Sequence, residues 1–252
     1  MTGLAGRIAI VTGGSEGIGA AIARGLAASG AAVAIVNRSH PERAAAVVSA
    51  IVSAGGTAAA FQADCSEVSS IEAVVDAISR HFGGIDILVN NAGIFRPVPI
   101  EETTEEIWDT QLDLNLKGAF FFARSVVPHM GRRGGGKIVN VSSIAGEAGF
   151  PNAAAYCASK GGLTNLSRAL ALELAGRNIN VNVLAPGNVA TAMNAALRED
   201  DGWRARMRER TPSGDDFLSV DDLVGSVLFL VGDGARKMHG QVLCVDGGWT
   251  AW

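Results

Sequence analysis

The chain has 252 residues, of which 48% are hydrophobic and 18% charged, so it can bury a sizeable core without disulfides or structural metals. Lysine and arginine number 21 and aspartate and glutamate 25, and the resulting net charge of −4 argues against a nucleic-acid-binding protein. Glycine is over-represented, with 32 residues, but lacks the three-residue period of collagen. The excess is therefore expected in tight turns and in loops that approach a ligand.

Membrane, secreted and metal-binding classes are not favoured either. No apolar stretch is long enough to span a bilayer, and the N-terminal residues lack the pattern of a signal peptide. The three cysteines, Cys65, Cys157 and Cys244, are far apart and show neither a C-x-x-C motif nor histidine partners at metal-site spacing. We expect a cytoplasmic protein with reduced thiols, no metal and no membrane partner.

Short apolar segments alternate with alanine-rich helical segments along the chain. Non-alternating apolar runs are typical of strands buried on both faces of a parallel sheet, and they occur at residues 8–11, 32–36, 58–62, 85–90, 137–141, 179–184 and 242–245. Helical patterns occupy residues 18–29, 42–54, 67–81, 104–130, 153–175 and 220–232. This order predicts one α/β domain over residues 1–252, with a doubly wound parallel seven-stranded sheet and helices on both faces.

Two segments fall outside this alternation. Residues 188–216 follow a predicted strand and are rich in charge, and ligands of open α/β sheets bind beyond the carboxyl ends of the strands. We interpret this segment as a substrate lid, with an ordinary pair of surface helices as the alternative. The arginine- and glycine-rich residues 132–136 are interpreted as a flexible turn that leads into the next strand.

A glycine-rich turn follows the first predicted strand, in the sequence Thr12-Gly-Gly-Ser-Glu-Gly-Ile-Gly19. Glycine permits the sharp turn out of the strand, the approach of a pyrophosphate and close helix–strand packing, and the following helix points its amides at the phosphates. The turn predicts a dinucleotide site that includes Gly13, Ser15, Glu16, Gly17, Ile18 and Gly19. Taken alone, a purely structural turn has the same pattern.

The end of the second predicted strand bears on which dinucleotide is bound. This strand ends in Asn37-Arg38-Ser39, and a guanidinium beside small polar side chains suits the 2′-phosphate of NADP. Glu16 acts in the opposite direction, because a carboxylate near the adenosine ribose suits NAD. We expect NADP to be favoured over NAD; a solvated Arg38 at a helix entry is the alternative.

A tyrosine and a lysine share one face of the helix predicted over residues 153–175. Tyr156, the only tyrosine of the chain, and Lys160 are four residues apart, and a nearby ammonium is expected to lower the pKa of the phenol towards a useful acid/base range. Ser143 lies thirteen residues before Tyr156, at the end of a predicted strand, where its hydroxyl can polarise a carbonyl oxygen. Ser142 is the rival hydroxyl.

Together these motifs resemble the short-chain dehydrogenase/reductase family in its single-domain form, including its 3-oxoacyl-carrier-protein reductases and its glucose and alcohol dehydrogenases. The resemblance rests on residues 12–19, Asn90-Asn-Ala-Gly93, Asn115, Ser143, Tyr156 with Lys160, Pro186-Gly187 and Val245-Asp-Gly-Gly248, and it covers the whole chain. It implies a Rossmann-type fold and an NAD(P)(H)-dependent oxidoreductase that interconverts a carbonyl and a secondary alcohol.

The resemblance also implies a role for individual residues. Tyr156 would be the acid/base, Ser143 would polarise the substrate oxygen, Lys160 would hold the nicotinamide ribose, and Asn115 would anchor a proton-relaying water. Further cofactor contacts are implied at Asn37, Arg38, Ser39, Asp64, Cys65, Asn91, Gly93, Pro186, Gly187, Val189 and Thr191. Family members form homotetramers, and we expect Trp249 and Trp252 at a subunit interface, with packing inside one chain as the alternative.

The substrate itself is not predicted. The segments that contact substrate in this family supply Phe95, Ala145, Glu147, Phe150, Asn152, Met193 and Trp203, a mostly apolar set that fits several small carbonyl compounds. Three other functions are weighed against carbonyl reduction: a catalytically silent NAD(P)-binding regulator on the same scaffold, an NAD-preferring sugar or polyol dehydrogenase, and an enzyme that uses the cofactor for epimerisation or dehydration. An intact Tyr156 and Lys160 argue against the silent binder.

Overall fold

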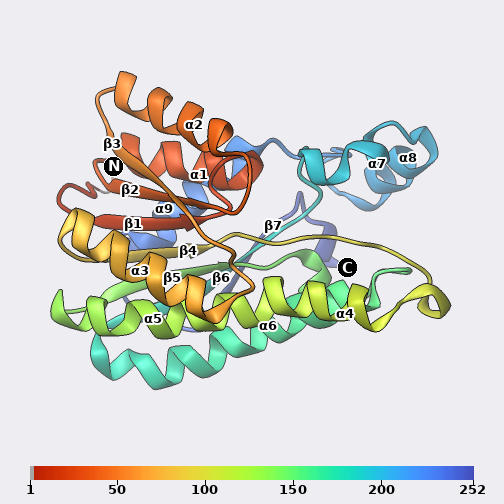
Figure 1. The fold of residues 1–252 in the computed structure, drawn as a ribbon. Helices are drawn as coiled ribbons and strands as arrows, with labels where there is room; N and C mark the ends of the chain where they lie inside the picture. Colours follow the sequence, from red (N-terminus) through yellow and green to blue (C-terminus); the bar gives the residue numbers. More distant parts are fainter. Residues whose placement is uncertain (1–2) are drawn as a thin grey trace.

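A computed structural model describes residues 3–252. Seven parallel strands form one sheet in the order β3-β2-β1-β4-β5-β6-β7 (Figure 1). The strands are β1 (Ile8–Thr12), β2 (Ala32–Asn37), β3 (Thr57–Gln62), β4 (Ile87–Asn90), β5 (Gly136–Val141), β6 (Ile179–Pro186) and β7 (Val242–Val245). The doubly wound seven-stranded sheet predicted from the sequence is confirmed.

Helices cover both faces of the sheet (Figure 1). One face packs against α1 (Gly17–Ala28), α2 (Pro41–Ser53) and α9 (Val224–Val231), and the other against α3 (Val68–Phe82), α5 (Ala119–Arg132) and α6 (Ala154–Leu174). On the first face Leu26 and Leu230 join the core, and on the second Ile78 and Phe122 do so; all four side chains are buried. Burial of these aliphatic and aromatic side chains is the main favourable contribution to the fold.

The two edge strands differ from the prediction that every strand is buried on both faces. β3 pairs only with β2 and leaves most of its residues exposed or half-exposed, and β7 is half-exposed along its length. The five inner strands are buried almost throughout. An apolar run therefore identified each strand, but burial at the sheet edges depends on neighbours that the run does not reveal.

The single helix predicted over residues 104–130 is interrupted. It consists of α4 (Glu105–Leu112), a π-helical segment (Asp113–Gly118) and α5. The predicted start is confirmed, because the Thr104 hydroxyl accepts a hydrogen bond of 3.2 Å from the Ile107 amide. The π-helical segment, with its wider i→i+5 hydrogen bonding, places Asn115 inside the fold.

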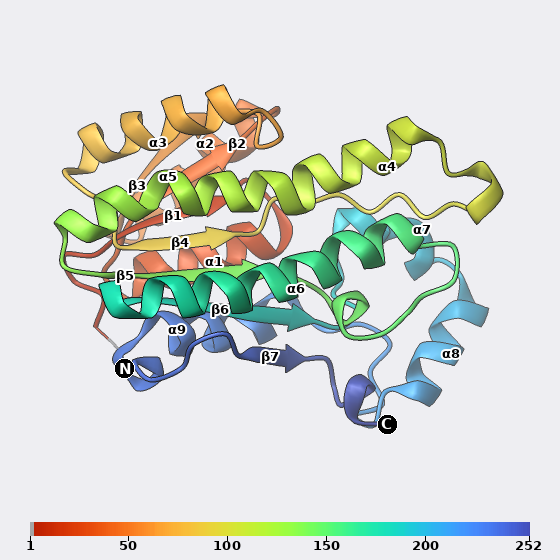
Figure 2. The same ribbon diagram turned by 90° about the horizontal axis from the view of Figure 1, so that it is seen from below.

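The loops that follow the strands gather at the carboxyl edge of the sheet. The strand order reverses between β1 and β4, which is where ligands bind in open α/β folds. Beyond this edge lie α7 (Ala195–Arg198) and α8 (Asp201–Arg210), both from the predicted lid segment (Figure 2). In the described part of the chain, no helix combines the length and apolar character needed to cross a bilayer.

The turn at residues 132–136 is anchored rather than free, contrary to the expectation of a flexible turn. Arg133 donates to the carboxylate of Asp86 from both Nε and Nη2, each at 3.1 Å, and the Asp86 side chain is only 1% exposed. The same carboxylate accepts the Ile8 amide at 2.9 Å, so the turn is tied to the amino end of the sheet. This partner lies 47 residues away and could not be predicted from local sequence patterns.

Candidate active site

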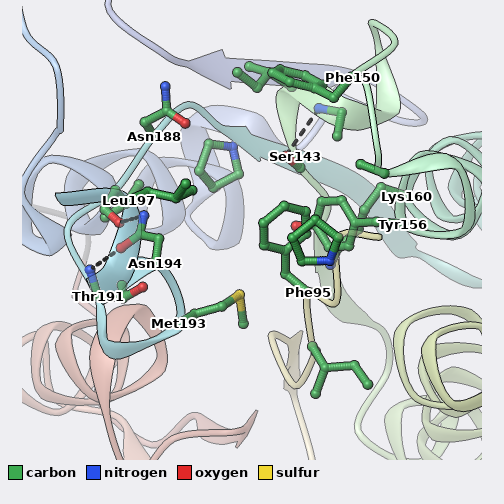
Figure 3. Close-up of a pocket in the computed structure, with 18 of the residues that line it drawn as sticks. Phe95, Ser143, Phe150, Tyr156, Lys160, Asn188, Thr191, Met193, Asn194 and Leu197 are labelled. Carbon is green, nitrogen blue, oxygen red and sulfur yellow. Dashed lines mark hydrogen bonds between the residues drawn. The ribbon is translucent and has the colours of Figure 1, made fainter. Parts of the chain in front are cut away.

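A cavity of about 860 Å³ opens at the carboxyl edge of the sheet. One wall carries Ser143, Tyr156, Lys160 and Phe95, and the facing wall carries Thr191, Met193, Asn194 and Leu197 from the lid segment (Figure 3). Residues of the glycine-rich turn line the same cavity. The predicted phosphate turn, the predicted catalytic residues and residues 188–216 therefore surround one space.

The glycine-rich turn is shaped so that side chains cannot fill it. Gly13 has φ +63°, and a Cβ at Gly19 would lie 2.3 Å from the Gly13 carbonyl oxygen. Asn91 holds the turn from behind, because its Nδ2 donates to the carbonyl oxygens of Thr12 at 2.9 Å and Gly13 at 3.2 Å. Ser15, Glu16, Gly17 and Ile18 line the cavity beside the start of α1. Such a cradle of bare backbone at a helix N-terminus fits the pyrophosphate of a dinucleotide.

The residues predicted to contact the adenosine end lie together but outside this cavity. Asn37 Nδ2 donates to the Ser39 carbonyl oxygen at 2.9 Å, and Arg38 Nη1 lies 3.7 Å from Asp64 Oδ2. Burial acts to raise the pKa of the Asp64 carboxyl, but hydrogen bonds from Ser66 and the charge of Arg38 outweigh it and lower that pKa. The Arg38 side chain is 63% exposed, so its guanidinium is accessible to a ligand.

Cys65 is among the cofactor contacts that the family resemblance implies, but its side chain points into the core, where burial raises the pKa of the thiol to about 12. Its backbone is also covered on one side, since a Cβ at Gly118 would lie 2.1 Å from the Cys65 carbonyl oxygen. The side chain at position 65 is therefore a packing residue.

Ser143 and Tyr156 bring two hydroxyl groups together. Ser143 follows β5 and Tyr156 lies in the first turn of α6; the Ser143 hydroxyl is close enough to the phenol to act on its pKa, and it accepts a hydrogen bond of 3.1 Å from the Ala145 amide. Ser142, the rival hydroxyl, is buried and donates instead to the Lys160 carbonyl oxygen at 3.0 Å. The thirteen-residue offset therefore selected the hydroxyl that meets Tyr156.

The Tyr156 phenol keeps its proton at neutral pH in this environment. Desolvation raises the pKa of Tyr156 to about 12, against the lowering effect of the Ser143 hydroxyl. The expected lowering by Lys160 is wrong for this structure, because burial dominates and the Lys160 Nζ lies 5.8 Å from the centre of the ring. A protonated phenol next to a serine hydroxyl suits protonation of a carbonyl oxygen. Phe95 fixes the ring by an edge-to-face contact of 4.9 Å between ring centres.

Lys160 is a buried ammonium without a carboxylate partner among the described residues. Lys160 is 4% exposed, and its Nζ donates a hydrogen bond of 2.9 Å to the Val141 carbonyl oxygen. Burial lowers the pKa of the amine to about 8. A Cβ at Gly93 would lie 3.5 Å from this Nζ and 3.1 Å from Asn115 Oδ1, so the three predicted residues share one corner of the site.

The Asn115 side chain connects two segments of the site by hydrogen bonds. Its Oδ1 accepts from the Ile94 amide at 2.8 Å, and its Nδ2 donates to the Ile94 carbonyl oxygen at 3.0 Å and to Ser159 Oγ at 3.1 Å. Both amide hydrogens are used, so the side chain holds the loop after β4 against α6. The Asn115 Oδ1 accepts one hydrogen bond and can accept a second, so the water predicted at this residue stays a prediction.

Most of the remaining residues predicted to contact cofactor or substrate line the cavity. Pro186, Gly187, Val189 and Thr191 line the cavity where β6 ends and the lid begins. Of the predicted substrate-contacting residues, Phe95, Ala145, Phe150, Asn152, Met193 and Trp203 also line it, whereas Glu147 does not. Sequence reasoning missed Asn188, Asn194, Leu197, Arg206, Met207 and Arg210, most of which lie on short helices that residue patterns did not resolve.

Trp249 is buried by its own chain, not at a subunit interface as predicted. It is 5% exposed and stacks on Phe150, with ring centres 5.0 Å apart and planes at 17°. The guanidinium of Arg210 lies over the ring, 4.6 Å from its centre. Trp252 is 84% exposed, and its Nε1 donates to the Arg210 carbonyl oxygen at 3.1 Å.

Comparison with known proteins agrees with this geometry. Residues 7–202 match the family model described as short chain dehydrogenase. The chain belongs to the short-chain dehydrogenase family. It is 39% identical to a gluconate 5-dehydrogenase of Gluconobacter oxydans, over 98% of this chain and 96% of that protein. It is 38% identical to a D-threitol dehydrogenase of Mycolicibacterium smegmatis, over 98% of this chain and 94% of that protein.

A solved structure shares the whole arrangement. A gluconate 5-dehydrogenase from Burkholderia cenocepacia J2315, in complex with NADP and tartrate, superposes with a TM-score of 0.95 at 38% identity, covering 99% of this chain and 97% of that one. This chain, as a short-chain dehydrogenase, is an NAD(P)(H)-dependent oxidoreductase that interconverts a carbonyl and an alcohol. The bound nicotinamide supplies or accepts the hydride.

Proposed function

We propose that this protein is an NADP(H)-dependent dehydrogenase for a small, polar secondary alcohol or the corresponding ketone, with Tyr156 as the acid/base. The observation that supports this most directly is that Ser143 and Tyr156 lie on the same wall of the cavity, facing the lid. In the direction of reduction, Ser143 donates a hydrogen bond to the carbonyl oxygen while the Tyr156 phenol delivers its proton to that atom. In the direction of oxidation, Tyr156 first loses its proton to solvent, and the resulting phenolate then accepts the proton of the substrate hydroxyl.

Lys160 and Asn115 support this step in the proposal. Lys160 would bind the nicotinamide ribose and supply positive charge next to Tyr156 when the phenol has lost its proton, an effect that strengthens in a water-poor site. Asn115 would keep Lys160 and the loop after β4 in place through its bonds to Ile94 and Ser159. The remaining catalytic position in the proposal is a water that relays protons from Lys160 to solvent.

The preference for NADP over NAD is supported by Arg38. Its guanidinium is accessible at the end of β2, next to Asn37 and Ser39, where a 2′-phosphate would lie. Glu16, the residue that favours NAD, forms an ion pair with Arg43 and is partly neutralised by it. The Burkholderia relative carries NADP in its structure, which agrees with this assignment.

Assembly and location are proposed as a homotetramer in the cytoplasm. Large apolar side chains are exposed on α4, α5 and α6, namely Trp108, Phe120 and Leu172, and their burial in a subunit contact would be favourable. The three cysteines are free, as expected in a reducing compartment. Light scattering coupled to gel filtration tests the assembly, and a monomer at micromolar concentration would contradict it.

Adjacent serines provide the test of the chemistry. Ser143→Ala is expected to lower kcat roughly 100-fold, because it removes the hydroxyl that binds the reacting oxygen. Ser142→Ala removes the buried hydroxyl one residue earlier, which contacts Lys160 and Thr164, and is expected to keep kcat within about threefold while lowering stability by about 1 kcal/mol. Nicotinamide absorbance with a panel of ketones and secondary alcohols measures both. Equal losses of kcat in the two variants would refute the assignment of Ser143.

A further inference from the structure

The four arginines of α8 divide into two pairs on opposite sides of the helix. With about 100° of rotation per residue, Arg204 and Arg208 share one side, and Arg206 and Arg210 share the other. The first pair binds Asp216, whose Oδ2 lies 2.7 Å from Arg204 Nε and 2.9 Å from Arg208 Nη2. The second pair lines the rim of the cavity together with Trp203 and Met207. The two pairs therefore have different surroundings on one short helix.

Among the described residues, the cavity-facing pair forms no ion pair. Within residues 3–252, neither Arg206 nor Arg210 lies within 4 Å of a carboxylate, although Glu209 shares an adjoining hollow with both. The cavity lining holds three basic residues, Lys160, Arg206 and Arg210, but one acidic residue, Glu16, which is paired with Arg43. The cavity is thus lined by an excess of positive charge in a chain whose net charge is −4.

Arg210 is also held in place. Its guanidinium lies over the Trp249 ring, which stacks in turn on Phe150, a residue of the cavity wall. Trp252 Nε1 donates to the Arg210 carbonyl oxygen and fixes the end of α8. A guanidinium that covers an aromatic face keeps the N–H groups at its edge available to a planar anion. The stack therefore orients a cation without occupying its hydrogen-bond donors.

We propose that Arg206 and Arg210 bind an anionic group of the substrate, so that the natural substrate is a hydroxy or oxo compound bearing a carboxylate or a phosphate. This inference rests on the proposed function, in which Tyr156 and Ser143 hold the reacting oxygen. The anionic group takes no part in the chemistry. In oxidation the reacting carbon would lose hydride to the cofactor while its hydroxyl proton passes to the Tyr156 phenolate, and the reverse holds for reduction.

Matched pairs of compounds test the proposal by kinetics. Gluconate and glucitol differ in one carboxylate, tartrate and threitol in two, and glucose 6-phosphate and glucose in one phosphate. The wild-type enzyme is expected to oxidise at least one anion with a kcat/KM at least roughly tenfold above that of its neutral partner. The gluconate and glucose 6-phosphate arms show whether the group is a carboxylate or a phosphate.

Variants on the two sides of α8 separate recognition from stability. Arg206→Met and Arg210→Met are each expected to raise KM for the anion roughly tenfold, with kcat and the KM of the neutral partner unchanged. Arg208→Met is the matched control: it makes the same substitution on the side that binds Asp216, and KM for the anion should stay within about twofold. Equal effects of all three variants, or equal effects on anion and neutral partner, overturn the proposal.

A binding measurement keeps the proposal independent of turnover. Gluconate, tartrate and glucose 6-phosphate are titrated calorimetrically into the NADP-loaded protein. An anion should bind less tightly as the sodium chloride concentration increases, and it should not bind to the variant that carries both Arg206→Met and Arg210→Met. If none of the three anions binds, or if the variants weaken NADP binding as much as anion binding, the proposal is overturned. Anion binding with no turnover of any compound leaves the anion site intact and contradicts the proposed function instead.

Discussion

Lys160→Met is expected to inactivate the enzyme and, at the same time, to stabilise the cofactor-free fold. The side chain of Lys160 is buried and its charge is opposed by no carboxylate in the described part of the chain, with the Val141 carbonyl oxygen as its hydrogen-bond partner. Burial lowers the pKa of the amine from 10.5 to about 8, which corresponds to about 3 kcal/mol of free energy that the charged form costs the native state. Methionine has a similar length and no charge.

The size of the effect follows from two opposing changes. Removing the ammonium gains about 3 kcal/mol at pH 7, and losing the hydrogen bond to the Val141 carbonyl costs about 1 kcal/mol. The free energy of unfolding of Lys160→Met at pH 7 is therefore expected to be about 2 kcal/mol higher than that of the wild type. Lys237→Met, which replaces an exposed lysine, is the matched control and should change stability by less than about 0.5 kcal/mol.

The pH dependence has a definite sign. Lysine in the unfolded chain keeps its proton up to about pH 10.4, whereas native Lys160 loses it near pH 8, so between these values the unfolded state binds more protons. Stability of the wild type therefore rises with pH in this window, by about 1 kcal/mol from pH 7 to pH 9. The same rise is absent in Lys160→Met, so the difference between the two proteins shrinks as the pH increases.

Urea unfolding of the cofactor-free proteins, followed by circular dichroism at one protein concentration, measures these differences. NADPH consumption measures the loss of activity separately. A variant that is less stable than the wild type at pH 7, or a stability difference that does not change between pH 7 and pH 9, would refute the view that Lys160 is a costly buried charge.

Three further outcomes are expected. Tyr156→Phe should lower kcat by a factor of about 10²–10⁴, because it removes the proton donor, while NADPH fluorescence still reports binding; unchanged kcat would exclude Tyr156 as the acid. Gly19→Ala places a Cβ 2.3 Å from the Gly13 carbonyl oxygen and should weaken NADPH binding at least roughly tenfold, whereas Gly176→Ala, with open space around its Cβ, should not. Arg38→Ala should raise KM for NADPH by a factor of about 10 and leave KM for NADH unchanged; equal changes would remove Arg38 from phosphate recognition.

The strands and the catalytic residues could be predicted because each depends on local features. A buried parallel strand is an apolar run, and the pairing of Tyr156 with Lys160 is a consequence of helical spacing. The roles of these residues came from the family resemblance, and the structure shows that Ser143, rather than Ser142, reaches Tyr156.

What could not be predicted depends on contacts between distant segments. The pKa of Tyr156 is set by burial, which spacing does not reveal, so its direction was predicted wrongly. The π-helical segment changes the spacing of buried residues, which from Gln111 to Met130 recur nearly every four residues instead of every 3.6. This spacing can be recognised only after the buried residues are known from the structure. Arg206 and Arg210 belong to a short helix whose position over the cavity is decided by tertiary packing.

The stack of Phe150, Trp249 and Arg210 provides an optical reporter inside the enzyme. It joins the loop after Ser143, the segment after β7 and the lid helix α8, so any displacement of α8 changes the surroundings of the Trp249 indole. Trp108 and Trp252 are exposed and Trp203 is half-exposed, and replacing these three with phenylalanine leaves Trp249 as the sole indole emitter. Its fluorescence would then follow lid movement during turnover in real time, without an attached dye.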